Sequence, residues 1–141
     1  MNGKKTLGIF LLLFLLMDVS SMDKKYNIDL GDSIIICHVT SEIAERTVTL
    51  QCKIIRVLKN GQNFKKEQII NLKYRPTKVT PYLSFDDKKH YIIFIDKKLN
   101  ILKNNGEWQV FEYKKEIEEN ITNELKNFHS KSLASHRNSS F

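Results

Sequence analysis

TVTLQCKIIRVLKNG, residues 47–61, is the stretch that decides the fold. Apolar and polar side chains alternate from Val48 to Ile54, which is the period of a β-strand with one buried face. The alternation slips by one position at Ile55, and this slip predicts a β-bulge or a sharp bend in a long strand. Asn60 and Gly61 then predict a turn.

Further strands are predicted on both sides of this stretch. The segment from His90 to Asp96 is almost continuously apolar, which is typical of a strand that is covered on both faces. Asn104, Asn105 and Gly106 predict a tight hairpin turn, because asparagine and glycine tolerate a positive φ. The other expected strands are residues 33–40, 67–74, 99–103 and 107–113.

The period of the pattern changes after residue 113. Ile117, Ile121, Leu125 and Phe128 recur at helical spacing, so they predict an amphipathic helix over residues 114–128 that packs on the sheet. Five to six strands and one C-terminal helix predict a mainly β fold, and we expect a small OB-like barrel. Residues 129–141 are serine-rich with little apolar content, and they predict a disordered tail.

The first residues have the features of a secretory leader. Lys4 and Lys5 precede an apolar run from Leu7 to Met17, which is about half of the roughly 20 residues that a membrane-spanning helix needs. Small residues before position 22 predict cleavage after Ser21. The sequence therefore predicts a signal peptide over residues 1–21, a single domain over residues 22–128 and a secreted protein without a stable membrane anchor.

The charge balance is basic. Lysine and arginine exceed aspartate and glutamate by 23 − 16 = +7, and removal of the predicted leader leaves 21 − 15 = +6. In a secretory compartment this favours sulfated glycans or anionic lipid surfaces over nucleic acid. Solubilising surface charge is the more ordinary explanation of the lysines. The candidate anion-binding residues are Lys53, Arg56, Lys59, Lys65, Lys66, Lys73 and Arg75.

Two segments resemble netrin-like modules. Residues 46–61 are similar to the long second strand of that family, in which a Cys-Lys-Val-x-Val core runs into a Leu-Lys-Gly turn. Residues 86–95 resemble a later strand, in which an acidic turn leads into an aromatic and aliphatic run. The resemblance covers about residues 31–128, and it implies an OB-type fold with an extracellular binding role.

The chain departs from one branch of that family. The tissue inhibitors of metalloproteases begin with a cysteine whose amine and carbonyl chelate the protease zinc, and they have a dense set of disulfides. Here the predicted mature protein begins at Met22, and the first cysteine is Cys37. The resemblance therefore does not imply inhibition by zinc chelation.

The two cysteines predict one disulfide in an oxidising compartment. Cys37 and Cys52 both lie in phase with apolar neighbours, so both can point into the same core across a hairpin. Closing a loop of about 15 residues contributes roughly 3 kcal/mol in the chain-entropy model. A pair of buried free thiols is the alternative.

Modification sites are predicted by two sequons, which begin at Asn120 and Asn138. The four histidines show no metal-ligand spacing, and the sequence has no nucleophile elbow, phosphate-binding glycine loop or nucleotide motif. We therefore expect no cofactor, no metal and no enzymatic activity.

The sequence predicts a secreted, non-enzymatic binding module of netrin-like type, whose partner is an extracellular matrix or cell-surface protein or a sulfated glycan. One alternative is an inhibitor of a secreted hydrolase that inserts the proline-bracketed loop from Tyr74 to Phe85. Another is a lineage-specific secreted effector, because a fold alone does not determine function.

Overall fold

The computed structural model describes residue 26, residues 28–29, 31–80 and 82–139, and for residues 131–139 it describes the backbone alone. The predicted leader, residues 1–21, lies outside this part of the chain. No helix among the described residues combines the length and the apolar content that a membrane crossing requires.

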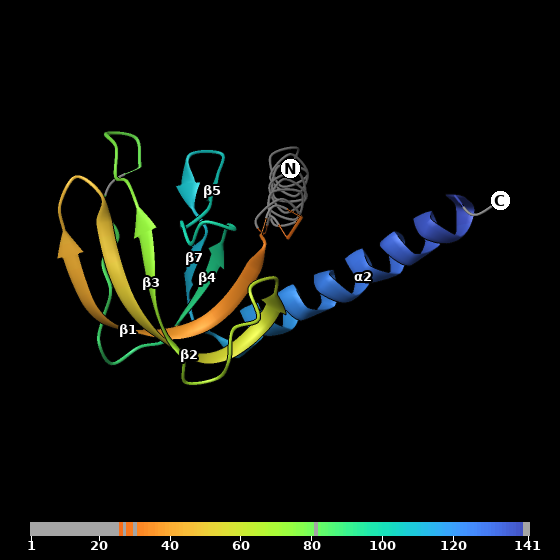
Figure 1. Cartoon of the computed structure of the whole chain (residues 1–141), viewed down its shortest axis with the longest axis horizontal. Coiled ribbons are helices and arrows are strands. Elements are labelled where there is room, and N and C mark those ends of the chain that lie inside the picture. Colours follow the sequence, from red (N-terminus) through yellow and green to blue (C-terminus); the bar gives the residue numbers. More distant parts are fainter. Residues whose placement is uncertain (1–25, 27, 30, 81, 140–141) are drawn as a thin grey trace, which may run out of the picture.

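Five antiparallel strands form a curved sheet in the order β3-β2-β1-β4-β7 (Figure 1). Two short strands, β5 and β6, pair in a separate hairpin whose turn has positive φ at Asn105 and Gly106. The expected mainly β fold with one C-terminal helix is confirmed. The strands are β1 Ser33–Ala44, β2 Val48–Asn60, β3 Ile69–Tyr74, β4 Tyr91–Ile95, β5 Lys103–Asn104, β6 Glu107–Trp108 and β7 Val110–Glu112.

The sheet is not closed into the barrel that the sequence predicted. Its edge strands are β3 and β7, and residues 99–103, which were expected to form a full strand, lie between β3 and the end of β4. In that segment, isolated bridges join Asn100 to Lys73 and Ile101 to Ile95. The chain enters it through Leu99 at a φ of 64°. The segment is hydrogen-bonded to both strands, since the Ile101 amide donates to the Lys73 carbonyl and the Leu102 amide donates to the Phe94 carbonyl, but these contacts do not extend into a continuous ladder.

The bulge predicted at Ile55 is confirmed. In the β1–β2 ladder, Ile54 and Arg56 oppose consecutive residues of β1, so Ile55 has no partner, and a second skip occurs at Leu58. Both skipped side chains pack against the outer face of the sheet. The two bulges therefore allow one strand to supply apolar side chains to both faces.

Both faces of the sheet are buried at β4 and the first half of β1, as the apolar β4 segment predicted. The inner face forms the larger cluster, which we call the inner core, and the outer face forms a smaller one, the outer core. The inner core includes Ile35, Cys37, Val39, Leu50, Cys52, Ile54, Leu72, Tyr74, Tyr91, Ile93 and Ile95. The outer core comprises Ile28, Ile34, Ile36, Ile92, Phe94 and Ile121.

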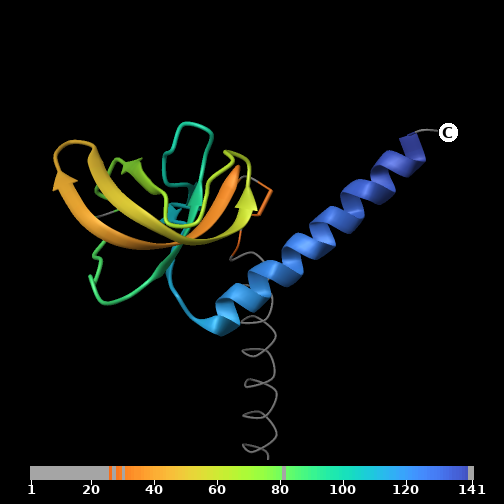
Figure 2. The same cartoon turned by 60° about the horizontal axis from the view of Figure 1, so that its bottom comes forward.

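The outer core is covered by helix α2, Lys115–Ser139. Ile121 is fully buried there, and Ile117 and Leu125 are partly buried beside it. The helix extends well past Phe128, so the disordered tail expected from residue 129 is corrected to helix up to Ser139. Residues 115–139 contain no glycine or proline to end it. Both views show its second half projecting away from the sheet (Figure 1, Figure 2).

We predict that Ile121→Ala lowers the free energy of unfolding by about 2–5 kcal/mol, because it leaves a cavity in the outer core. Asn123→Ala is the matched control, since Asn123 is exposed on the same helix, and it should change stability by less than about 0.5 kcal/mol. Urea unfolding measures both values. Equal effects of the two substitutions would show that α2 is not packed through Ile121.

Candidate anion-binding face

Lys53 and Lys73 lie on one exposed face of two paired strands. Lys53 on β2 opposes Ile69, and Lys73 on β3 opposes Thr49. Their neighbours Cys52 and Leu72 point into the inner core, so both lysines point outward. Four residue positions separate the two lysines along the strands, which corresponds to about 13 Å. The suggestion that they share an outer face is confirmed.

The side chains that lie directly between these lysines are uncharged. Between them, Gln51 opposes Asn71, and all four side chains are exposed. Within the part of the chain that the structure describes, no ion pair involves Lys53 or Lys73. We call this surface of β2 and β3 the basic face.

Three more of the predicted cations lie at the ends of β3. Lys65 and Lys66 belong to a turn before the strand, in which the Gln68 amide donates to the Lys65 carbonyl at 3.1 Å. Arg75 follows directly after the strand, and all three side chains are exposed. The sequence therefore distributes five exposed cations along the length of β3 and its partner.

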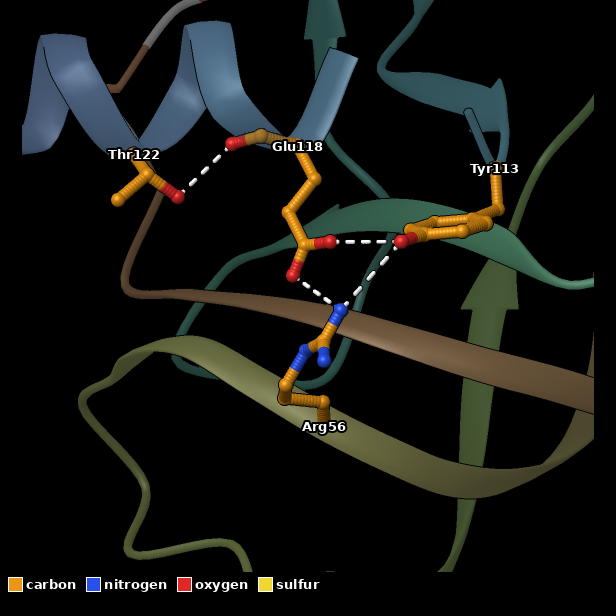
Figure 3. A network of polar contacts seen from close by, with 4 residues as sticks. All are labelled: Arg56, Tyr113, Glu118 and Thr122. Carbon is orange, nitrogen blue, oxygen red and sulfur yellow. Dashed lines mark hydrogen bonds and ion pairs between the residues drawn. The ribbon is translucent and has the colours of Figure 1, made fainter. Parts of the chain in front are cut away.

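The other two predicted cations make contacts inside the protein. Lys59 donates to the carbonyl of Ile28 at 3.1 Å, and its Nζ lies 5.5 Å from the ring centroid of Phe128. Arg56 forms an ion pair with Glu118 of α2 (Figure 3). These contacts give both residues a structural role, so we do not include them in the basic face.

The contact at Arg56 joins three elements of the fold. The Arg56 guanidinium also donates to the Tyr113 hydroxyl at 3.4 Å, and that hydroxyl donates to Glu118 at 2.7 Å (Figure 3). The bond to Glu118 raises the pKa of the Tyr113 hydroxyl above its usual value. The first turns of α2 are thus attached to β2 and to the residue that follows β7.

Two histidines lie beside the basic face. His38 of β1 opposes Lys53, and the rings of His38 and His90 are 6.0 Å apart between centroids. The sequence alone does not place these histidines together, because strand register cannot be read from one strand. Among the described residues, no three His, Cys, Asp or Glu side chains are arranged to bind a metal ion.

The two cysteines are fully buried thiols in the inner core. Cys37 opposes Ile54 and Cys52 opposes Val39, so the cysteines are diagonal neighbours on β1 and β2. A hydrogen bond with the Cys52 thiol, together with burial, raises the pKa of the Cys37 thiol well above its usual value. The shared core is confirmed, and the disulfide stays a prediction because the structure has no bond between them.

The proline-bracketed loop after Tyr74 is attached to the domain at several points. The Tyr74 hydroxyl accepts from the Leu83 amide at 3.1 Å, and Phe85 packs on Tyr91 with ring centroids 5.0 Å apart. Thr77 and Thr80 bond to each other through backbone and hydroxyl groups. Among the described residues of this loop, the side chains of Val79 and Tyr82 are 82% and 60% exposed.

An open polar cleft of about 830 Å³ lies at the C-terminal end of β2. Its lining residues include Asp32, Lys59 and Asp96. Its carboxylates bind the adjoining loops. Asp32 accepts from Gln62 at 3.0 Å, and Asp96 accepts from the amides of the turn that follows it. These contacts give the cleft a structural explanation.

The predicted sequons both fall on α2. Asn120 is half-buried in the first half of the helix, and Thr122 of the same sequon donates to the Glu118 carbonyl at 2.8 Å. Asn138 lies near the end of the helix, where the structure describes the backbone alone. Glycosylation at both sites stays a prediction.

Comparison of the chain with protein-family models and with curated proteins finds no match.

We predict that Arg56→Gln lowers the free energy of unfolding by about 1–2 kcal/mol, because it leaves the half-buried Glu118 carboxylate without its cation. The control is Lys89→Gln, since Lys89 and Glu112 form an exposed pair at 3.3 Å. Loss of that pair should cost less than about 0.5 kcal/mol. A double-mutant cycle with Glu118→Gln measures the coupling, and additive effects would contradict a direct interaction.

We predict that the secreted protein gives no thiol labels in guanidinium chloride until it is reduced, and two labels afterwards, because Cys37 and Cys52 are bridged. Alkylation followed by mass spectrometry measures the number of labels. Two labels without reductant would establish the free-thiol alternative. Without denaturant, neither the bridged protein nor the free-thiol protein should be labelled. In the free-thiol protein both cysteines are buried, and the pKa of the Cys37 thiol is raised.

Proposed function

We propose that this chain is a secreted, non-enzymatic binding module whose basic face engages a sulfated glycan of the extracellular matrix or cell surface. The observation that supports the proposal is the placement of Lys53 and Lys73 on one exposed face, where neither forms an ion pair with any residue that the structure describes. A strand surface with spaced cations complements an extended polyanion, because charges repeat along both.

The flanking cations lengthen this surface. Lys65 and Lys66 lie before β3 and Arg75 lies after it, so positive charge is available beyond both lysines of the strands. The neutral side chains of Gln51 and Asn71 lie between the two lysines and can donate hydrogen bonds to sulfate or hydroxyl oxygens. Together these groups provide both attraction and directional contacts.

A netrin-like relationship is part of the proposal. The first segment that resembles that family, residues 46–61, contains β2. The second, residues 86–95, contains β4 and the turn before it. Both strands belong to the five-stranded sheet. Secretion is likewise proposed, from the leader-like residues 1–21. A secreted module meets sulfated glycans in the extracellular space, where such polymers are the abundant polyanions.

We predict that the protein is retained on heparin at low salt and that Lys53→Gln with Lys73→Gln weakens heparin binding about tenfold. This loss corresponds to about 1.4 kcal/mol, which is reasonable for two exposed charge contacts. The salt concentration at elution and calorimetric titration measure the effect.

The matched control is Lys115→Gln with Lys126→Gln, which removes the same charge from two exposed positions on α2. This double variant should bind within about twofold of the unmodified protein, because its lysines lie off the basic face. Failure of the unmodified protein to bind heparin would refute the proposal. Equal losses in the two double variants would show that binding depends on net charge alone.

A further inference from the structure

We infer that His90, His38 and Lys53 form a subsite for one sulfate ester group, and that this subsite strengthens glycan binding as the pH falls. The inference rests on the proposed function, because it assigns one part of the polyanion to one set of side chains at the border of the basic face. Its own observation is the arrangement of three basic side chains on neighbouring strands.

Strand register brings these side chains into one row. Lys53 of β2 opposes His38 of β1. On the other side of β1, Cys37 opposes Tyr91, so the next position along the two strands places His38 beside His90. The ring centroids of the two histidines are 6.0 Å apart, and the rings meet edge to face.

All three side chains lie on the outer face. The neighbours of the row, Cys37, Cys52 and Tyr91, point into the inner core, and alternation along a strand directs the intervening residues outward. His90 and Lys53 are exposed, and His38 is half-buried. A sulfate group can therefore approach the row from solvent without displacing any part of the fold.

The His38 ring is held in position by the backbone. Its Nε2 lies within hydrogen-bond distance of the Asp87 carbonyl oxygen, which can only accept, so Nε2 donates the proton. Nδ1 is then the atom that gains the second proton when the ring becomes charged. The backbone contact persists in both states, which keeps the ring oriented.

The charged groups around the row are few. Lys53 faces it from β2, and Asp86 and Asp87 precede it in the chain. Asp86 accepts from the Lys88 amide at 2.9 Å, which directs its carboxylate to its own turn. From the far side of β4, Glu112 is paired with Lys89. In the adjacent row, Arg56 is paired with Glu118. Tyr113, whose amide donates to the His90 carbonyl at 2.8 Å, donates its hydroxyl proton to the same carboxylate. Glu67, whose amide donates to the Ile54 carbonyl at 2.7 Å, and Asp87 are the nearby carboxylates that form no ion pair among the described residues.

Protonation changes the charge of the row from one to three. Histidine side chains gain their charge between about pH 8 and pH 5, whereas sulfate esters stay ionised throughout that range. The imidazolium form is present at low pH and is lost as the pH rises. The contribution of the subsite to binding therefore increases on acidification and disappears in mildly alkaline solution.

Calorimetric titration of heparin into the mature protein at about pH 7.5 and about pH 5.5 tests the subsite. We expect the affinity to rise about tenfold on acidification, as two added exposed contacts would give. His38→Gln with His90→Gln should abolish most of this rise, measured as the ratio of the affinities at the two pH values. Lys115→Gln with Lys126→Gln should keep the whole rise.

Hyaluronan, a glycan with carboxylates and no sulfate, identifies the group that is recognised. It should show no comparable gain on acidification, and a gain equal to that of heparin would overturn the assignment to sulfate. Inorganic sulfate and inorganic phosphate at matched concentration serve as competitors. Competition by phosphate alone would likewise overturn that assignment.

The outcomes separate the two proposals. No heparin binding at either pH refutes the proposed function, and the subsite falls with it. Binding with an unchanged pH response in the double histidine variant refutes the subsite alone. Because His38 contacts the backbone, the single variant His90→Gln is measured as well. The His90 side chain is exposed, so it can be replaced without loss of folding. This variant should lose about half of the pH effect, expressed as the logarithm of the ratio of the two affinities.

Discussion

The structure depends on one constraint, which is that β1 is apolar on both faces and must be covered twice. Ile34, Ile35 and Ile36 are consecutive and at most 2% exposed, so they alternate between the outer and inner cores. The curvature of β2 and β3 provides the inner cover. Helix α2 provides the outer one, and the interaction of Arg56 with Glu118 fixes where it begins. Every other feature is arranged around these two covers.

The same constraint explains where the charged surface lies. Helix α2 covers the outer face over β1 and β4, and the cover does not extend to the outer face of β2 and β3 near Lys53 and Lys73. That surface has only one buried side, so its outward positions are polar and available to a partner. The outer face is thus divided into a covered half and an open half. Arg56, which is paired with Glu118 of α2, belongs to the covered half, and Lys53 and Lys73 belong to the open half.

Much of the fold follows from local patterns in the sequence. The slip at Ile55, the turn at Asn105 and the stripe around Ile121 each have a short-range physical cause, and each appears in the structure as predicted. Whether the expected barrel closes completely could not be predicted, because closure depends on long-range register, and the sheet is not closed. The length of α2 was underestimated because an apolar stripe measures only the part of a helix that packs. The proximity of His38 to His90 could not be predicted, since it requires the pairing of strands far apart in the sequence.

The location of Trp108 has a consequence for spectroscopy. It is the single tryptophan, it packs against the inner core, and its ring lies 5.2 Å from that of Tyr74. The outer core contains no tryptophan, whereas α2 dominates the helical signal in circular dichroism. Intrinsic fluorescence and ellipticity therefore observe opposite layers of the same sheet. Coincident denaturation curves would mean that both layers melt as one cooperative unit, and separated curves would reveal an intermediate that has lost its helix but retained its sheet.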